Sequence, residues 1–99
     1  MPGRRKYYVY IMTNKWNSVL YTGVTSDLGR RAEVHRSGSA EGFASKYRAK
    51  KLVFFETYED PLAAIAREKQ IKAGSSLKKL EPIRGASPGW RDLSGDLLP

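Results

Sequence analysis

The sequence predicts a small α/β (α+β) fold, a three-stranded antiparallel sheet flanked by helices in the order β-β-α-β-α-α. Three runs rich in aromatic and β-branched residues are typical of strands: Tyr7 to Met12, Val19 to Val24 and Leu52 to Tyr58. After the third run, Asp60-Pro61 places a hydrogen-bond acceptor before a proline, which marks a helix start. One helix is predicted between the second and third strands, and further helices are predicted after the third. Elements in this order pack as a single sheet that is covered by helices.

The length of 99 residues allows one small domain with a modest core. We place this domain at residues 1–93 and expect residues 94–99 to form a flexible C-terminal tail. The chain has no cysteine and one histidine, which excludes disulfides and thiolate or histidine-rich metal sites. The apolar run near residue 10 is too short for a signal peptide or a membrane span, so we expect a cytoplasmic protein without membrane contact.

The first two strands should form an antiparallel hairpin, because residues 13–18 contain the Asn and Ser residues that favour turns. A helix over residues 27–37 should follow, with Thr25 or Ser26 as its cap and Gly38 at its end. Three residues of this helix share one side: Leu28, Ala32 and His35.

Residues 41–48 should form a loop or a short helix before the third strand. The next helix should cover residues 61–73 and end before Gly74. Its predicted apolar stripe consists of Leu62, Ile65, Ala66 and Ala73. A last short helix should reach Arg84, and two apolar residues should anchor the segment after it to the core: Trp90 and Leu93.

The formal net charge of +8 and the sequence pI near 9.9 indicate a polyanionic partner. Residues 30–51 carry seven Lys or Arg residues and two Glu residues. Because aromatic residues are interleaved with these charges, we prefer nucleic-acid contact to an evenly solvated basic surface. Five residues are predicted to bind nucleic acid through its backbone, without sequence readout: Arg30, Lys46, Arg48, Lys50 and Lys51.

Two triplets separated by ten residues, Tyr8-Val9-Tyr10 and Tyr21-Thr22-Gly23, resemble the motifs that name the GIY-YIG nuclease superfamily. Three further features follow in that family's order. Arg31 lies ten residues after Tyr21, the tyrosine of the second triplet. His35 lies four residues after Arg31, and Glu68 lies in the distant AREKQIK segment. The resemblance is closest to the small stand-alone bacterial members.

This resemblance implies a metal-dependent endonuclease that hydrolyses phosphodiester bonds in DNA, as in DNA repair or processing. It implies structural roles for Tyr8 and Gly23 in the two triplets. It also implies catalytic roles for four residues: Tyr10, Tyr21, Arg31 and His35.

The residue types suit this chemistry. The guanidinium of Arg31 matches phosphate oxygens bidentately, and His35, one helical turn away, can exchange a proton near neutral pH. Composition alone would treat Arg31 as a solvated residue like Arg30, and only the resemblance distinguishes them. The general base stays open among three residues, with Tyr21 preferred to His35 and Tyr10.

Glu68 is the only carboxylate between residues 61 and 80. Without a metal it would form an exposed pair with Lys72, worth about 0.3–0.5 kcal/mol. The resemblance implies that Glu68 binds Mg²⁺ or Mn²⁺, and Mg²⁺ is often held by one carboxylate together with waters and substrate phosphate.

Two other functions stay open on the same fold: a non-catalytic nucleic-acid-binding module and a nuclease subunit that depends on a protein partner. The enzyme is preferred, because a pure binder has no use for a carboxylate where phosphate approaches. We expect the nucleic acid to be DNA and the protein to be a monomer or a weak dimer.

Overall fold

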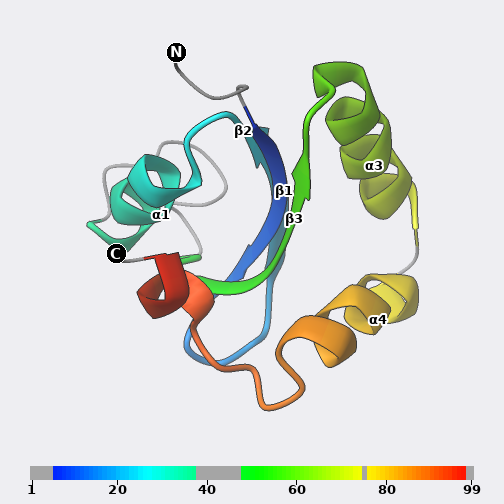
Figure 1. Ribbon diagram of the computed structural model, residues 1–99. Helices are drawn as coiled ribbons and strands as arrows, with labels where there is room; N and C mark the ends of the chain where they lie inside the picture. The colour runs from blue at the N-terminus through cyan, green and yellow to red at the C-terminus, as the bar shows by residue number, and fades with distance from the viewer. Residues whose placement is uncertain (1–5, 38–47, 75, 98–99) are drawn as a thin grey trace.

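The computed structural model describes residues 6–37, 48–74 and 76–97, and Figure 1 shows its sheet between two layers of helices. Three antiparallel strands form the sheet in the order β2-β1-β3: β1 (Tyr7–Thr13), β2 (Leu20–Thr25) and β3 (Lys51–Tyr58). One face is covered by α1 (Leu28–Arg36) and the 3-10 helix η1 (Leu93–Leu97). The other face is covered by α3 (Pro61–Ala73) and α4 (Ser76–Ala86). The predicted fold class and element order are confirmed.

A turn held by side chains joins β1 to β2. The Asn14 side chain accepts a hydrogen bond from the Ser18 N–H at 2.9 Å and donates one to the Ser18 hydroxyl at 2.7 Å. Asn17 has a φ of 55°, in the left-handed region that asparagine tolerates better than most residues. The predicted hairpin and its Asn-rich turn are confirmed.

The sheet separates two hydrophobic clusters. The cluster on the α1 side contains Tyr10, Met12, Leu28, Ala49, Leu52 and Leu93. The cluster on the α3 side contains Val9, Ile11, Val53, Phe54, Ala64, Ile71 and Ile83. Pairing between β1 and β3 shifts by one residue at Ile11/Met12, and this β-bulge lets the adjacent residues Val53 and Phe54 face the same cluster.

Helix α1 begins one residue later than the sequence predicted. Asp27 is the cap, because its carboxylate accepts a hydrogen bond from the Arg30 N–H at 3.1 Å, whereas Thr25 accepts one from the Asp27 N–H. The prediction of Thr25 or Ser26 as the cap was therefore wrong. The predicted common side is confirmed, since three residues are buried together: Leu28, Ala32 and His35. Gly38 and the segment 41–47 lie outside the described residues.

Helix α3 has the predicted bounds but buries a different face. The predicted stripe was wrong, because Leu62 is 73% exposed and Ile65 is 38% exposed, while Ala64 and Ile71 are buried. Where the helix packs against β1 and β2, the small side chain of Ala64 fits the contact. Glu68 lies four residues after Ala64 and three before Ile71, so it belongs to the side that faces the sheet.

The C-terminal segment contains a second helical element after α4. Helix α4 continues to Ala86, and both Trp90 and Leu93 pack against the core, as expected. The 3-10 helix η1 overlaps the start of the segment 94–99 that was predicted to be a tail, and Asp92, just before it, accepts hydrogen bonds from the N–H groups of Ser94 at 3.0 Å and Leu52 at 3.2 Å. The bond from Leu52, the second residue of β3, attaches this segment to that strand. Among the described helices, none has the length and apolar character needed to cross a bilayer.

Candidate active site

Four of the predicted catalytic residues lie together on the α1 side of the sheet. The ring centroids of Tyr10 and Tyr21 are 6.3 Å apart, and His35 lies 5.9 Å from Tyr10 and 5.3 Å from Tyr21. The Arg31 Nε donates a hydrogen bond to the Tyr10 hydroxyl at 3.4 Å. We call Tyr10, Tyr21, Arg31 and His35 the tyrosine–arginine cluster.

Strand register and helical spacing bring these residues together. Tyr10 pairs with Gly23 across the β1–β2 ladder, so Tyr21, two residues before Gly23, is its diagonal neighbour on the same face. Arg31 and His35 lie one turn apart on α1, which packs over this face. Tyr8, from the first triplet, packs against the same hydrophobic cluster.

Gly23 leaves the space that the Tyr10 ring occupies. A Cβ at this position would lie 2.5 Å from the Tyr10 hydroxyl oxygen and 2.6 Å from Cζ, closer than any side chain tolerates. A phenol from the neighbouring strand therefore takes the space that a side chain at residue 23 would need. The structural role implied for Gly23 is thereby explained by packing.

Burial controls the protonation of Tyr10. Burial raises the pKa of the Tyr10 hydroxyl above its ordinary value of 10.0, and the hydrogen bond from Arg31 offsets this only in part. The same hydrogen bond raises the pKa of Arg31, which keeps its charge. Tyr10 is therefore a neutral phenol at pH 7 that holds an exposed guanidinium at the edge of the cluster.

His35 is a buried, neutral ring. It is 2% exposed, and burial together with the charge of Arg31 lowers its pKa below 6.5, while the nearby backbone of Ala49 acts in the opposite direction. Within the described part of the chain, neither ring nitrogen has a hydrogen-bond partner. His35 therefore fills the space beside both tyrosines and contributes no charge at neutral pH.

Glu68 is not part of this cluster. It lies on α3, which packs on the opposite face of the sheet, and its carboxylate pairs with the Lys72 ammonium at 2.9 Å. The Glu68 side chain is 14% exposed. Helix α3 contacts β2, the edge strand that also carries Tyr21, on the face opposite the tyrosine–arginine cluster.

Glu68 is the residue on which metal binding at this site would depend. The described residues contain no group of three or more acidic or histidine side chains that could enclose an ion. One carboxylate fits the way Mg²⁺ is held when waters and a substrate phosphate supply the remaining ligands. Glu68 is the carboxylate that would hold the ion, and Lys72, which now pairs with it, would have to leave it.

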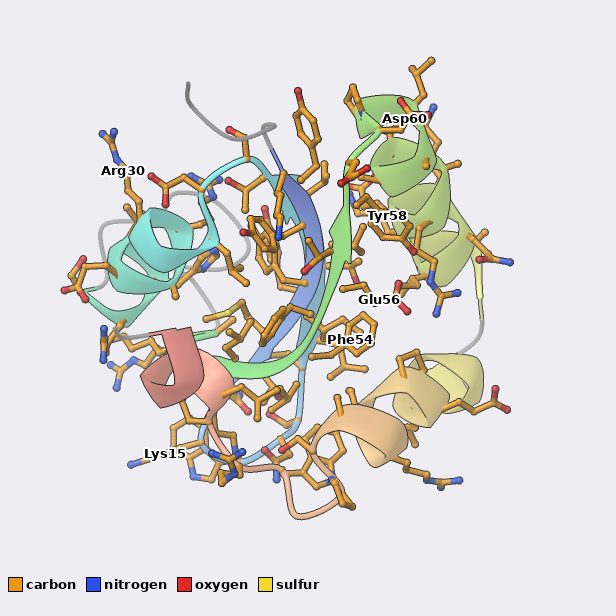
Figure 2. All side chains as sticks on the ribbon, in the orientation of Figure 1. Lys15, Arg30, Phe54, Glu56, Tyr58 and Asp60 are labelled. Atoms are coloured by element: carbon orange, nitrogen blue, oxygen red, sulfur yellow. The ribbon has the colours of Figure 1, made fainter. Side chains whose placement is uncertain are left out.

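The predicted nucleic-acid-binding residues lie in different places. Figure 2 shows Arg30 pointing away from the sheet, on the outer side of α1. Lys46 lies outside the described residues. The other three, Arg48, Lys50 and Lys51, line a cavity of about 330 Å³, which we call the basic cavity. Four residues that were not predicted to bind nucleic acid line it with them: Lys15, Trp16, Arg36 and Asp92. A tryptophan beside a lysine in a hairpin turn was the signal that could have indicated this site.

Comparisons with known proteins agree with the fold and with the triplets. Residues 6–81 match the family model described as the GIY-YIG catalytic domain. A UPF0213 protein of Staphylococcus haemolyticus is 37% identical over 79% of this chain and 94% of its own length. A UPF0213 protein of Clostridium perfringens is 38% identical over 81% of this chain and 85% of its own length.

A solved structure supports the same assignment. The solution NMR structure of a UPF0213 protein from Bacillus halodurans is 28% identical, with a TM-score of 0.54. The similarity covers 88% of this chain and 92% of that chain. The chain therefore belongs to the GIY-YIG nuclease superfamily, and within it to the small UPF0213 proteins.

Proposed function

We propose that this protein is a divalent-metal-dependent endonuclease that hydrolyses phosphodiester bonds in DNA, an activity of the kind used in DNA repair or processing. The observation that carries the proposal is the tyrosine–arginine cluster. It presents one exposed guanidinium, held by a buried phenol, beside a second phenol. A fixed positive group at the position of developing charge is the main requirement for phosphodiester hydrolysis.

Each member of the cluster has a separate role. Arg31 binds the non-bridging oxygens of the scissile phosphate and stabilises their charge in the transition state. Tyr10 is unsuited to take a proton at pH 7, since its pKa is raised, and it positions Arg31. His35 is buried and orients the two tyrosines. Tyr21 is thus the residue we assign to the attacking water, either directly or through a second group.

The metal is assigned to Glu68. Bound there with water and the substrate phosphate, Mg²⁺ or Mn²⁺ would polarise a phosphoryl oxygen. This arrangement requires the DNA to cross the edge strand β2. Tyr21 lies on one face of this strand, and α3 packs against the other face.

The second candidate is a non-catalytic nucleic-acid-binding module. One observation favours it, namely that Glu68 already has a partner in Lys72 and needs no metal to balance its charge. This function would depend on the basic residues and not on Glu68.

Cleavage assays separate the two functions. The purified protein would be incubated with labelled single-stranded, duplex and branched DNA in Mg²⁺, in Mn²⁺ and in chelator. We expect metal-dependent cleavage that Glu68→Gln lowers by about a hundredfold or more, while DNA binding persists. Glu81→Gln, which removes an exposed carboxylate from α4, is the matched control and should cleave normally.

Two results would contradict this assignment. If the wild-type protein bound DNA but cleaved none of the substrates with either metal, the binding module would be the correct function. If Glu68→Gln cleaved as fast as Glu81→Gln, the metal could not act through Glu68.

A further inference from the structure

The basic cavity lies outside the tyrosine–arginine cluster, and its described lining comes from three segments that carry the cationic residues and from Asp92, which precedes η1. Lys15 and Trp16 come from the β1–β2 turn, Arg36 from the last residue of α1, and Arg48, Lys50 and Lys51 from the entry to β3. Among the residues that the structure describes, five cationic side chains therefore line one cavity, and Asp92 is the one carboxylate beside them. Such a concentration of charge attracts a polyanion.

The carboxylate of Asp92 is already engaged by the protein. It accepts hydrogen bonds from the N–H groups of Leu52 and Ser94 and from the Ser94 hydroxyl. Burial alone would raise the pKa of Asp92, but these bonds and the charge of Arg36 outweigh it and lower the pKa. The Asp92 carboxylate therefore stays ionised and anchors η1. The cationic side chains around the cavity outnumber this one negative charge.

Trp16 is a large aromatic residue that does not pack in the hydrophobic core. Its side chain is 61% exposed, in contrast to Trp90, which packs against the α3-side cluster. The Lys15 ammonium lies 4.8 Å from the ring centroid, a cation–π contact that orients the indole. An exposed, oriented indole among cations is a surface on which a nucleic-acid base can stack.

The backbone on both sides of the cavity is in an uncommon conformation. Arg48 has a φ of 56° and Asn17, next to Trp16, has a φ of 55°. An arginine in the left-handed region is held at a cost that its surroundings must offset, and such residues cluster at ligand sites. This conformation fixes the direction in which Arg48 leaves the chain.

We propose that the basic cavity binds an unpaired nucleotide of single-stranded DNA. The base stacks on Trp16, and the flanking phosphates contact Arg36, Arg48, Lys50 and Lys51. A base inside a duplex is already stacked on its neighbours and cannot occupy this position. This inference rests on the proposed function and narrows its substrate to DNA that is unpaired beside the scissile phosphate.

The cavity is close enough to the tyrosine–arginine cluster for one strand to reach both. Arg36 follows His35 directly and lies five residues after Arg31, which is about 7.5 Å along the helix axis. Ala49, next to Arg48, packs in the same hydrophobic cluster as Tyr10. A strand bound at Arg31 can therefore continue along α1 to Trp16.

Binding measured in chelator tests this proposal independently of cleavage. The probes are a single strand of about ten nucleotides, the matched duplex, and the same single strand with abasic sites, which keeps the phosphates and removes the bases. Trp16→Ala should weaken binding of the intact strand about tenfold or more, and Trp16→Phe should restore most of it. Leu62→Ala, which removes another exposed apolar side chain from α3, should bind as the wild type does.

The abasic strand gives the sharpest comparison. Wild-type protein should bind it as weakly as Trp16→Ala binds the intact strand, and Trp16→Ala should not distinguish the two strands. Equal binding of the intact strand by wild type and Trp16→Ala, or the same loss with the duplex, would overturn the proposal. Trp16-dependent binding without any cleavage would support the cavity and refute the nuclease, whereas cleavage with no Trp16 effect would do the reverse.

Discussion

Gly23 and Tyr10 occupy one space on neighbouring strands, and this pair allows a test at the level of single atoms. Gly23→Ala places a methyl group 2.5 Å from the Tyr10 hydroxyl oxygen, so the ring must move and Arg31 loses its support. We expect a loss of about 1–3 kcal/mol in the free energy of unfolding, together with loss of DNA cleavage. Urea unfolding and a cleavage assay measure the two effects.

The control is another glycine with free space around it. A Cβ added at Gly85, in α4, meets no atom within 4 Å, so Gly85→Ala should be neutral or slightly stabilising. If Gly23→Ala were as stable and as active as Gly85→Ala, the close packing of Tyr10 against Gly23 would be wrong.

His35 predicts a pH dependence of stability. The pKa of His35 is lower in the folded protein than the 6.5 of an ordinary histidine. At pH values between the folded pKa and 6.5, the unfolded chain therefore binds more protons than the folded protein. The free energy of unfolding should therefore fall as the pH drops below about 6.5 and continue to fall until the folded pKa is passed.

Replacing His35 with Phe removes this titration and keeps a ring beside Tyr10 and Tyr21. His35→Phe should lose less stability than the wild type between about pH 7 and pH 5. At about pH 7 it should be at least as stable, because two buried nitrogens that have no hydrogen-bond partner among the described residues disappear. Urea unfolding across this range is the measurement, and superimposable pH profiles for the two proteins would exclude this role for His35.

At the level of elements, the N-terminus of α3 offers a clear test. The Asp60 carboxylate accepts a hydrogen bond from the Leu62 N–H at 3.1 Å, and Pro61 occupies the first helical position. Figure 2 shows Asp60 at the N-terminal end of the helix. Asp60→Ala should lower the free energy of unfolding by about 1 kcal/mol, which in a domain of this size lowers Tm by about 4–8 °C.

Asp60→Asn keeps an acceptor oxygen and should retain most of the stability. Thermal unfolding followed by circular dichroism compares the three proteins. An Asp60→Ala variant that melts with the wild type would show that the helix does not depend on this cap.

Elements governed by local chemistry were predictable from the sequence. The hairpin followed from strand-forming runs around an Asn-rich turn, and α3 followed from the Asp60-Pro61 start and Gly74. The buried face of α3 was not predictable from hydrophobicity, because contact with the sheet selects the small Ala64 and leaves Leu62 exposed. Side-chain size at a tertiary contact is not visible in a periodic pattern.

The candidate site shows the same division. The resemblance selected Tyr10, Tyr21, Arg31 and His35 by their order, and the structure brings these four together. The sequence predicted only part of the basic cavity, because its described residues come from four segments that are distant in the chain and that the fold brings together. Trp16 appeared to be an ordinary turn residue until its neighbours in space were known.

For the whole molecule, the distribution of charge predicts how DNA binding responds to salt. Each phosphate contact on a single strand contributes about −0.7 to the slope of log K against log salt. If Arg48 contacts phosphate, Arg48→Ala should make that slope shallower by about 0.7 and weaken binding of all sequences alike. Lys69→Ala, on the exposed side of α3, should leave the slope unchanged.

Fluorescence anisotropy in chelator at several salt concentrations gives both slopes. An Arg48→Ala slope equal to that of the wild type would place the DNA elsewhere on the surface. The same result would leave the tyrosine–arginine cluster without its neighbouring binding surface.

The most direct test of the nuclease assignment compares two adjacent arginines of α1. Arg31 contacts Tyr10 in the cluster, whereas Arg30 points away from the sheet (Figure 2). Single-turnover cleavage of labelled DNA in Mg²⁺ or Mn²⁺ should fall by about a hundredfold or more in Arg31→Ala. Arg30→Ala should lose no more than the few-fold expected for one surface charge. Equal cleavage rates in the two variants would contradict an active site built around Arg31.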